Sequence, residues 1–510
     1  MVVQHNMQAM NANRMLNVTT SAQSKSTEKL SSGYKINRAA DDAAGLTISE
    51  KMRKQIRGLD QASTNAQDGV SSVQTAEGAL TEVHSMLQRM NELATQAANG
   101  TNSKDSDRQA IQDEIDQLTT EIDRVSETTK FNETYLLKGE AGTKTINMKA
   151  HDAGLKGTLT DNGDGTATFV MDSLKDGDSV SIGGKTYKIG SKLDDAKNLI
   201  KAPATGTVDV EIGDQKFKIK SDGEVQNANG DKLYVKTADG SAAAATFTAG
   251  TSTFTTSATF MNNAQTPTAT ANNALSVQNL QALVKGGVTV KVGNDTAIAM
   301  TDTAGGAADG VDDNDATLIT RQKAYELAGK ELLAANSIGD TENHVAVTNG
   351  NGDALAFDKG DGSFKINVGQ AKVANSLAFS LHVGADADMT NKIQVNIDAM
   401  DSASLGIKGL NIKDDSGNAA TYAVDAISDA ISKVSSQRSS LGAVQNRLEH
   451  TINNLDNVVE NTTTAESRIR DTDMAKEMVN YSKNNILAQA GQSMLAQANQ
   501  SNQGVLSLLQ

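Results

Sequence analysis

Cysteine and tryptophan are absent from this sequence, proline occurs twice, and aromatic residues make up only 3% of the 510 residues. Without cysteine the chain can form neither a disulfide nor a thiolate metal site, and this absence is compatible with any cellular compartment. Small and polar residues fill the sequence instead. Such a composition suits thin helical rods and tight turns better than the broad core of an enzyme.

Basic charge and long apolar runs are also scarce. The 47 Lys and Arg residues are outnumbered by 62 Asp and Glu residues, which leaves a net charge of −15. This acidic balance favours solubility and argues against a nucleic-acid-binding protein. No run reaches the roughly 18 apolar residues of a transmembrane helix, so we expect no membrane insertion. The first residues lack the basic segment and apolar core of a cleavable signal peptide, so we expect none.

The most regular feature of the sequence is an apolar repeat from Leu59 to Ala97, in which apolar or small residues recur at alternating spacings of three and four. A repeat of about 3.5 residues predicts a helix that buries one narrow stripe against another helix. The same spacing returns from Ile427 to Val459, so we predict that the chain folds back and that these two stretches pack together. The predicted rod core consists of Leu59, Val73, Leu80, Val83, Leu87, Met90, Ile431, Leu441, Leu448 and Leu455.

The first residues of the chain have a weaker pattern. Residues 1–32 carry sparse apolar positions among Asn, Ser and Thr, which predicts a weakly amphipathic helix that Gly33 ends. Asp41 and Asp42 stand where negative charge suits the N-terminus of the next helix. Since ordering one residue costs ~1 to 2 kcal/mol, we expect the sparse first helix to be mobile until a partner packs on it.

Two further helices are predicted. One opens at Ser103 or Asp105 and repeats the 3.5 spacing, so the rod should contain at least three helices. The other runs from about Ala465 to Leu509 and ends in several Leu and Val residues. Water solvates such an apolar end poorly, so it should pack on the first residues of the chain or on another molecule.

From about Lys144 the apolar period changes from 3.5 to two. Three similar segments, which begin at Ser179, Val208 and Val288, alternate β-branched residues around a glycine-containing turn and predict related β-hairpins. Short helices are expected near residues 192–200 and 316–335. The Ala- and Thr-rich tract from Ala242 to Ala274 predicts an exposed loop or irregular strands.

Sites for catalysis, cofactors or metals are not predicted. The acidic segments that begin at Asp161, Asp309 and Asp358 lack the spacing of an EF-hand calcium loop, and hairpin turns explain them. The six His residues are scattered, and we find no nucleotide-binding loop or nucleophile elbow. We therefore expect no catalytic residues, no cofactor and no metal ligands.

Four long motifs resemble bacterial flagellin. They are EKLSSGYKINRAADDAAGL from Glu28, QASTNAQDGVSSVQTAEGAL from Gln61, LGAVQNRLEHTINNL from Leu441, and QAGQSMLAQANQ from Gln489 with the VLSLL ending. The resemblance covers roughly the first 140 and the last 110 residues. It implies a subunit of the bacterial flagellar filament, used for motility, whose terminal helices line the inner tube of the polymer and whose middle projects outward.

The resemblance also implies partners and a location. Such a subunit binds further copies of itself, the flagellar export apparatus and its chaperone, and the filament cap and hook-associated proteins. It is secreted unfolded through the flagellar channel and resides in the extracellular filament. No enzymatic activity is implied.

With this resemblance, we expect a multidomain fold: an all-α coiled-coil rod built from both termini, with an inserted β-rich (α+β) variable middle region. Residues 1–45 form an N-terminal inner-core helix that pairs with residues 462–510. Residues 46–143 and 411–461 are the two halves of the rod, and residues 144–410 are the variable outer domains.

The family also carries a recognition site for vertebrate Toll-like receptor 5. Its motif reads here LQRMNELATQ from residue 87, and the matching receptor-binding residues are Arg89, Leu93 and Glu114. Spacing alone favours a solvated Arg beside a Leu that widens the core stripe, and only the family resemblance favours the receptor-binding interpretation. Met90 and Asn91 stand where many receptor-active members have valine and arginine, which removes one positive charge.

Two other functions stay open. A hook–filament junction protein of the same family would share the terminal helices but cap the hook in few copies. An adhesin or hydrolase carried on a coiled-coil stalk would place its site in the middle region.

Overall fold

The structure is a computed structural model that describes residues 6–99, 101, 106–236, 253–255, 274–302, 309–355, 360–414 and 417–507. Its contacts divide the chain into two compact units. The first, called the terminal unit, comprises Met1–Gly78, Ala378–Asn396 and Arg438–Gln510. The second, called the middle unit, comprises Ala79–Leu377 and Ile397–Gln437.

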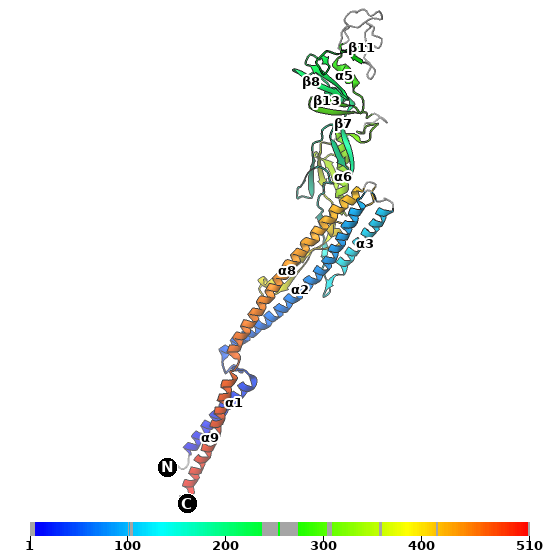
Figure 1. Ribbon diagram of the computed structural model, residues 1–510. Helices are drawn as coiled ribbons and strands as arrows, with labels where there is room; N and C mark the ends of the chain where they lie inside the picture. The colour runs from blue at the N-terminus through cyan, green and yellow to red at the C-terminus, as the bar shows by residue number, and fades with distance from the viewer. Residues whose placement is uncertain are drawn as a thin grey trace, which may run out of the picture. The chain divides into compact units, whose positions relative to one another are not determined.

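The terminal unit is built mainly from helices at both ends of the chain. These are α1 (Met7–Ser32), the first part of α2 (Ala43–Ala97), the last part of α8 (Asn418–Arg470) and α9 (Met474–Ser507). Helix α1 lies alongside α9 (Figure 1). Strands β19 (Leu377–His382) and β20 (Lys392–Ile397) form a hairpin with a short 3₁₀ turn, η1 (Met389–Asn391).

Helices α2 and α8 pack together in antiparallel directions, as their matching repeats predict. In the terminal unit Leu59 and Leu455 belong to one hydrophobic cluster, and Ala66 and Leu448 belong to the next. A step of seven residues forward in α2 is therefore matched by a step of seven backward in α8, which is the register of a coiled coil.

The β19–β20 hairpin packs on this helix pair. Its Leu381 and Ile393 belong to the same cluster as Ala66 and Leu448. Gly69 leaves the space for this contact, because a Cβ at that position would lie 2.2 Å from Leu381 Cδ1. The sequence-based boundary that assigned residues 144–410 to the outer domains therefore needs correction. Residues 378–396 belong to the terminal unit, because the apolar face of their hairpin packs on the parts of α2 and α8 that lie in this unit.

The breaks between the helices follow local capping chemistry. Helix α1 ends at Gly33, as predicted, with φ of 76°. Helix α2 begins well before Leu59, because Asp42 Oδ1 accepts a hydrogen bond of 2.9 Å from the amide of Gly45. The predicted start of the last helix near Ala465 is wrong: α8 continues to Arg470, and α9 begins at Met474.

In the middle unit, α3 (Asp107–Thr128) lies beside the last part of α2 (Figure 1). Its start differs from the prediction, since Ser106 occupies the N-cap and Ser103 and Asp105 lie outside the described residues. Arg108, only 3% exposed, donates hydrogen bonds to the carbonyl oxygens of Ala97 (3.2 Å) and Asp414 (2.7 Å). It thereby ties α3 to the end of α2.

The middle unit also contains most of the strands and four short or medium helices. The helices are α4 (Leu193–Leu199), α5 (Val277–Leu283), α6 (Arg321–Asn336) and α7 (Ser402–Leu405). One eight-stranded sheet has the order β10-β9-β8-β13-β14-β7-β15, with β6 paired to β7, and one four-stranded sheet has the order β16-β17-β5-β4. Two-stranded sheets join β1 to β2, β3 to β18 and β11 to β12.

The strands of the eight-stranded sheet are β6 (Ser179–Ile182), β7 (Lys185–Lys192), β8 (Thr207–Ile212), β9 (Gln215–Lys220), β10 (Val225–Gln226), β13 (Thr289–Val292), β14 (Asp295–Met300) and β15 (Leu318–Thr320). Those of the four-stranded sheet are β4 (Gly157–Asp161), β5 (Thr166–Met171), β16 (Ala346–Asn349) and β17 (Ser363–Asn367). The remaining strands are β1 (Lys130–Phe131), β2 (Thr134–Tyr135), β3 (Glu140–Asn147), β11 (Tyr234–Lys236), β12 (Thr253–Thr255) and β18 (Gln370–Asn375).

The three predicted hairpins are confirmed as β6–β7, β8–β9 and β13–β14. Each has a two-residue turn whose first residue is a glycine, namely Gly183, Gly213 and Gly293, with φ between 57° and 61°. A residue with a side chain would be strained there, so glycine sets the turn and with it the strand register.

Among the described residues, the middle unit contains two large hydrophobic cores and a small cluster around Ala371, Val373 and Ala403. One is centred on Phe169 and Phe364, whose stacked rings have centroids 6.2 Å apart. The other lies against the eight-stranded sheet and includes Val210, Phe217 and Leu280. The Ala- and Thr-rich tract from Ala242 lies almost entirely outside the described residues. None of the helices that the structure describes has a segment long and apolar enough to cross a bilayer.

Candidate assembly surface

Helices α1 and α9 expose an unusual amount of apolar side chain. Most of the large apolar side chains that are exposed in the described part of the chain lie on these two helices, with exposed fractions from 47% to 70%. They are Met7, Met10, Met15, Val18, Met474, Met478, Val479, Ile486, Leu487 and Met494. We call these residues the terminal apolar surface. Exposed apolar area of this kind marks a site of association.

The contact between α1 and α9 buries very little. Among the side chains described in these two helices, only Ser26 and Ala488 are buried. Asn6 Nδ2 donates a hydrogen bond of 3.1 Å to the carbonyl of Ala498. A Cβ added to Gly491 would lie 3.4 Å from Leu16 Cδ1, so the helices approach closely at this glycine. The pair therefore has hardly any core of its own, and its larger apolar side chains point outward.

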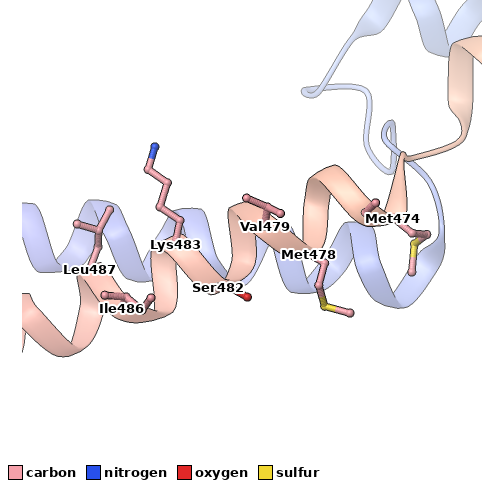
Figure 2. Close-up of a pocket in the computed structure, with 8 residues that line it drawn as sticks. Met474, Met478, Val479, Ser482, Lys483, Ile486 and Leu487 are labelled. Carbon is pink, nitrogen blue, oxygen red and sulfur yellow. The ribbon is translucent and has the colours of Figure 1, made fainter.

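The first half of α9 forms a shallow open groove. It is lined by Met474, Met478, Val479, Ile486 and Leu487, together with Ala475, Ser482 and Lys483. Figure 2 shows these side chains on the outer side of α9, with the thioether of Met478 extending into open space. Lys483 supplies the one charged group of this lining. The groove offers apolar contact and no catalytic or metal-binding arrangement.

Tyr34, just after the end of α1, makes contacts with both α2 and α8. The guanidinium carbon of Arg470 lies 4.7 Å from the centroid of its ring, and that of Arg53 lies 5.7 Å away. Arg470 also pairs with Glu50 at 2.9 Å, and Arg53 pairs with Glu466 at 3.5 Å. We call these five residues the Tyr34 cluster. It joins the end of α1 to α2 and to the end of α8.

Backbone hydrogen bonds support the same junction. The amide of Lys35 donates to the carbonyl of Arg470 at 2.6 Å, and the amide of Thr472 donates to Gly33 at 2.9 Å. The break after α1 and the break after α8 are thus bound side by side. Nearby, hydrogen bonds from the amides of Arg38 and Asn37 lower the pKa of Asp41. Asp41 therefore caps its own loop, whereas Asp42 caps α2.

Most of the predicted rod-core residues are buried. Leu59, Val73, Leu80, Val83, Leu87, Met90, Leu441, Leu448 and Leu455 are all less than 9% exposed, whereas Ile431 is partly buried. The structure thus places nine of the ten inside the helical packing of their own unit.

The three residues of the expected receptor surface do not share one surface. Arg89 Nε donates a hydrogen bond of 2.9 Å to Glu114 of α3, and Arg89 also pairs with Glu92 at 3.2 Å. These hydrogen bonds, with Glu114 the larger influence, raise the pKa of the half-exposed guanidinium. Leu93, by contrast, is only 2% exposed.

Leu93 is therefore not an exposed apolar anchor in the free subunit. Leu93 follows Arg89 by four residues, so both project from the same side of α2. Arg89 is half exposed and reaches Glu114 of α3, whereas Leu93 is buried. The reading of Leu93 as a residue that widens the core stripe is the one that its burial supports.

Comparison with known proteins agrees with the motifs in the sequence. The family model "Bacterial flagellin N-terminal helical region" matches residues 3–142, and "Bacterial flagellin C-terminal helical region" matches residues 424–509. A flagellin of Clostridium tyrobutyricum is 36% identical over 99% of this chain and 100% of its own length. A flagellin of Bacillus subtilis is 33% identical over 100% of both chains. The chain belongs to the bacterial flagellin family.

Among solved structures, flagellar hook-associated protein 3 from Legionella pneumophila matches this flagellin with 15% identity and a TM-score of 0.30. That match covers 82% of this chain and 98% of the other. Both family models fall on the helical ends, which carry the terminal apolar surface and the rod.

Sequence reasoning missed the Tyr34 cluster. Its five members come from two stretches far apart along the chain, residues 34–53 and 466–470, and none belongs to the 3.5-residue repeat. The signal that was available is the coincidence of two helix breaks, one at Gly33 and one after Arg470. A break in each of two paired helices predicts a shared junction, and a lone aromatic residue beside the first break is the natural partner for arginines.

Proposed function

We propose that this flagellin polymerises into the flagellar filament by burying the terminal apolar surface against other copies of itself. The observation that carries the proposal is the contrast within α1 and α9. Large apolar side chains are exposed, whereas only Ser26 and Ala488 are buried among the side chains described there. A helix pair with so little core gains most of its stabilisation from neighbouring subunits.

The test is elongation of filament seeds by monomer, followed by light scattering and electron microscopy. We expect Val479→Asp to lower the elongation rate at least about tenfold, because it places an unpaired charge in a buried contact. Val170→Asp is the matched control. Val170 is 49% exposed on β5 in the middle unit, so the same substitution there should leave elongation unchanged. Normal elongation by the Val479 variant would contradict the proposal.

Several partners follow from this role and from the family. We infer that the chain passes through the flagellar export apparatus with a chaperone, is secreted, and assembles outside the cell beneath a filament cap. Hook-associated proteins would then contact the first subunits. Pull-down of these components with the monomer, and loss of extracellular protein in an export-deficient strain, would test the inference.

The hook–filament junction protein remains the main alternative. A filament subunit is present in many copies, whereas a junction protein is present in few. Quantitative mass spectrometry of sheared filaments separates the two, since only the filament subunit would be the dominant component. An adhesin or hydrolase carried on a stalk would instead require glycan binding or substrate turnover by the middle region of the intact chain.

We also propose that Arg89 and Glu114 contribute to binding of Toll-like receptor 5. Their ion pair is half exposed on the outer side of α2 and α3, where a partner can reach both residues. Reversing a charge at a desolvated contact typically costs on the order of 2 to 5 kcal/mol, so Arg89→Asp should weaken receptor binding by more than about tenfold. Since neighbouring subunits would cover part of this surface, binding to intact filament should also be weaker.

The control for this substitution is Arg124→Asp. Arg124 is an exposed arginine on α3 that pairs with Glu121, so it has the same chemistry outside the expected contact. Binding of the receptor ectodomain to the monomer should fall for the Arg89 variant alone. Equal receptor binding by the parent and both variants would show that Arg89 is a solvated helix residue that does not contact the receptor.

A further inference from the structure

Methionine dominates the terminal apolar surface. Six of the 16 methionines of the chain lie on it: Met7, Met10, Met15, Met474, Met478 and Met494. Each of these six side chains is about half or more exposed. By contrast, Met90, Met171, Met300 and Met400 are at most 5% exposed.

Exposure decides which of these sulfur atoms an oxidant can reach. A thioether is oxidised without assistance from neighbouring groups, so its susceptibility follows access. Figure 2 shows the sulfur of Met478 held away from the backbone on the open side of α9, and Met474 stands at the start of the same groove. The six surface methionines are therefore accessible to an oxidant, as is Met389 outside the terminal apolar surface, and the four buried ones are protected.

Oxidation would change the chemistry of this surface. A thioether is apolar and adapts to irregular contacts, whereas its sulfoxide is polar and accepts hydrogen bonds. A sulfoxide placed in an apolar contact loses its hydration without gaining a donor, which disfavours the contact. The described lining of the groove on α9 contains Ser482 and Lys483 as its polar side chains, which is too few donors for several sulfoxides.

We infer that the six surface methionines form an oxidation-sensitive modification site that blocks assembly when a peroxide oxidises it. This inference rests on the proposed role of the terminal apolar surface in polymerisation. Hydrogen peroxide transfers one oxygen atom to the sulfur. The O–O bond breaks, an S–O bond forms, and water leaves as the peroxide is reduced by two electrons. The modification acts on the free subunit and is reversible by methionine sulfoxide reductases, which use a dithiol as reductant.

Assembly then protects the surface methionines from oxidation, and oxidation of a free subunit prevents its assembly. In the polymer the terminal apolar surface is covered by neighbouring copies, so its sulfur atoms are shielded from the oxidant. In the free subunit these sulfur atoms are accessible to the oxidant. The filament would therefore keep subunits that are already incorporated and exclude subunits oxidised before incorporation.

The experiment treats purified monomer with hydrogen peroxide, removes the oxidant with catalase, and measures elongation of untreated filament seeds. Mass spectrometry of peptides gives the oxidised fraction at each methionine. We expect the six surface methionines to be oxidised before Met90, Met171, Met300 and Met400, and elongation to fall at least about tenfold once they are. Treatment with the two sulfoxide reductases, one for each epimer, should restore elongation.

Two variants make the test specific. A variant with leucine at all six positions should elongate seeds equally well with and without peroxide. Met389→Leu is the matched control, because Met389 is 73% exposed but lies in η1, outside the terminal apolar surface. It should remain as sensitive as the parent. Full elongation by parent protein oxidised at the six positions, or equal sensitivity of the six-leucine variant, would overturn the inference.

A second measurement covers the case in which the six-leucine variant does not assemble. Parent monomer and parent filament are exposed to the same peroxide, and the oxidation rates of the six residues are compared. We expect rates at least about tenfold lower in the filament. Equal rates in both states would overturn the inference even if untreated subunits polymerise. Failure of untreated parent subunits to polymerise would instead contradict the proposed function.

Discussion

Tyr34 shows how a single side chain can connect separate helices. Its ring has an arginine near it from α2 and another from α8, and each of these arginines pairs with a glutamate. Cation–π contacts at partly exposed sites contribute about 0.5 to 1 kcal/mol each. Two such contacts on one ring are therefore enough to influence how often the contact between the break after α1 and the break after α8 opens.

We predict that Tyr34→Leu opens this junction. Loss of two cation–π contacts should cost about 1 to 2 kcal/mol, which corresponds to a roughly 5- to 30-fold larger opening constant. Hydrogen exchange of peptides that span residues 29–42 and 466–476 measures the change. Tyr34→Phe is the control, because it keeps the ring and loses only the 3.3 Å hydrogen bond from Arg53 Nη2. Identical exchange in the Leu and Phe variants would show that the ring contacts add nothing.

Glu224 gives a pH dependence that can be checked. It lies in the turn between β9 and β10, where hydrogen bonds from Gln226 and Lys220 lower its pKa to about 2. Because the folded pKa is below the usual value near 4.5, ionised Glu224 stabilises this turn fully above about pH 4.5. That contribution is lost as the pH falls from about 4.5 through 2.

We therefore predict that Glu224→Gln lowers hydrogen-exchange protection of residues 215–226 at pH 6. The variant should also lack the extra loss of protection that the parent shows between about pH 4.5 and 2, after correction for intrinsic exchange rates. Asp209→Asn on β8 serves as the control, since Asp209 is exposed on the neighbouring strand. A parent protein whose protection does not change over this range would contradict the role of Glu224.

Burial of individual residues could be predicted only where the sequence repeats. The nine buried members of the rod core follow directly from the 3.5-residue period. Leu93 lies outside that period, so the repeat did not predict that it is buried. Arg108 joins α3 to the end of α2 through its two carbonyl partners, and no local sequence pattern predicts those contacts.

At the level of elements, the pairing of α2 with α8 was predictable because both helices carry the same period. The residues at which the helices end were harder to predict. Helix α8 runs on to Arg470 because its last turn is held by the Tyr34 cluster, although its apolar repeat fades after Val459. The β19–β20 hairpin alternates like the other hairpins, so its sequence did not distinguish packing on the rod from packing in the middle region.

We predict that Leu448→Asp destabilises the helix pair by several kcal/mol, because it buries an unpaired carboxylate in the cluster with Ala66. Thermal unfolding followed by circular dichroism at the helical band measures this. Asn446→Asp adds the same charge two residues away at an exposed position, and its effect should stay within about 0.5 kcal/mol. Equal melting temperatures for the two variants would show that Leu448 does not lie in a closed core.

At the scale of the whole molecule, the two ends of the chain differ from the rest in how much they bury. The rod and the middle-unit cores contain many fully buried apolar residues, whereas α1 and α9 contain almost none. Ordering one residue costs about 1 to 2 kcal/mol, and a helix pair without a core recovers little of this. We therefore predict that α1 and α9 unfold readily in the monomer and become ordered on polymerisation.

Limited trypsin digestion tests this prediction, because the available cleavage sites are few. In α9 they are Lys476 and Lys483, and no Lys or Arg follows in the sequence; in α1 they are Arg14, Lys25 and Lys29. Digestion of the monomer should remove on the order of 30 residues from each end and stop at the rod. The same sites should resist cleavage in the filament, where neighbouring subunits cover the terminal apolar surface.

The rod supplies an internal control for the digestion. Arg89 and Arg124 are exposed trypsin sites within α2 and α3, but both helices are held by buried residues such as Leu87 and Ile122. Cleavage needs local unfolding, so these sites should stay intact in monomer and filament alike. Trimming of the ends at the same rate in both states would mean that polymerisation does not order them. Cleavage at Arg89 or Arg124 as fast as at Lys483 would mean that the ends are no less stable than the rod.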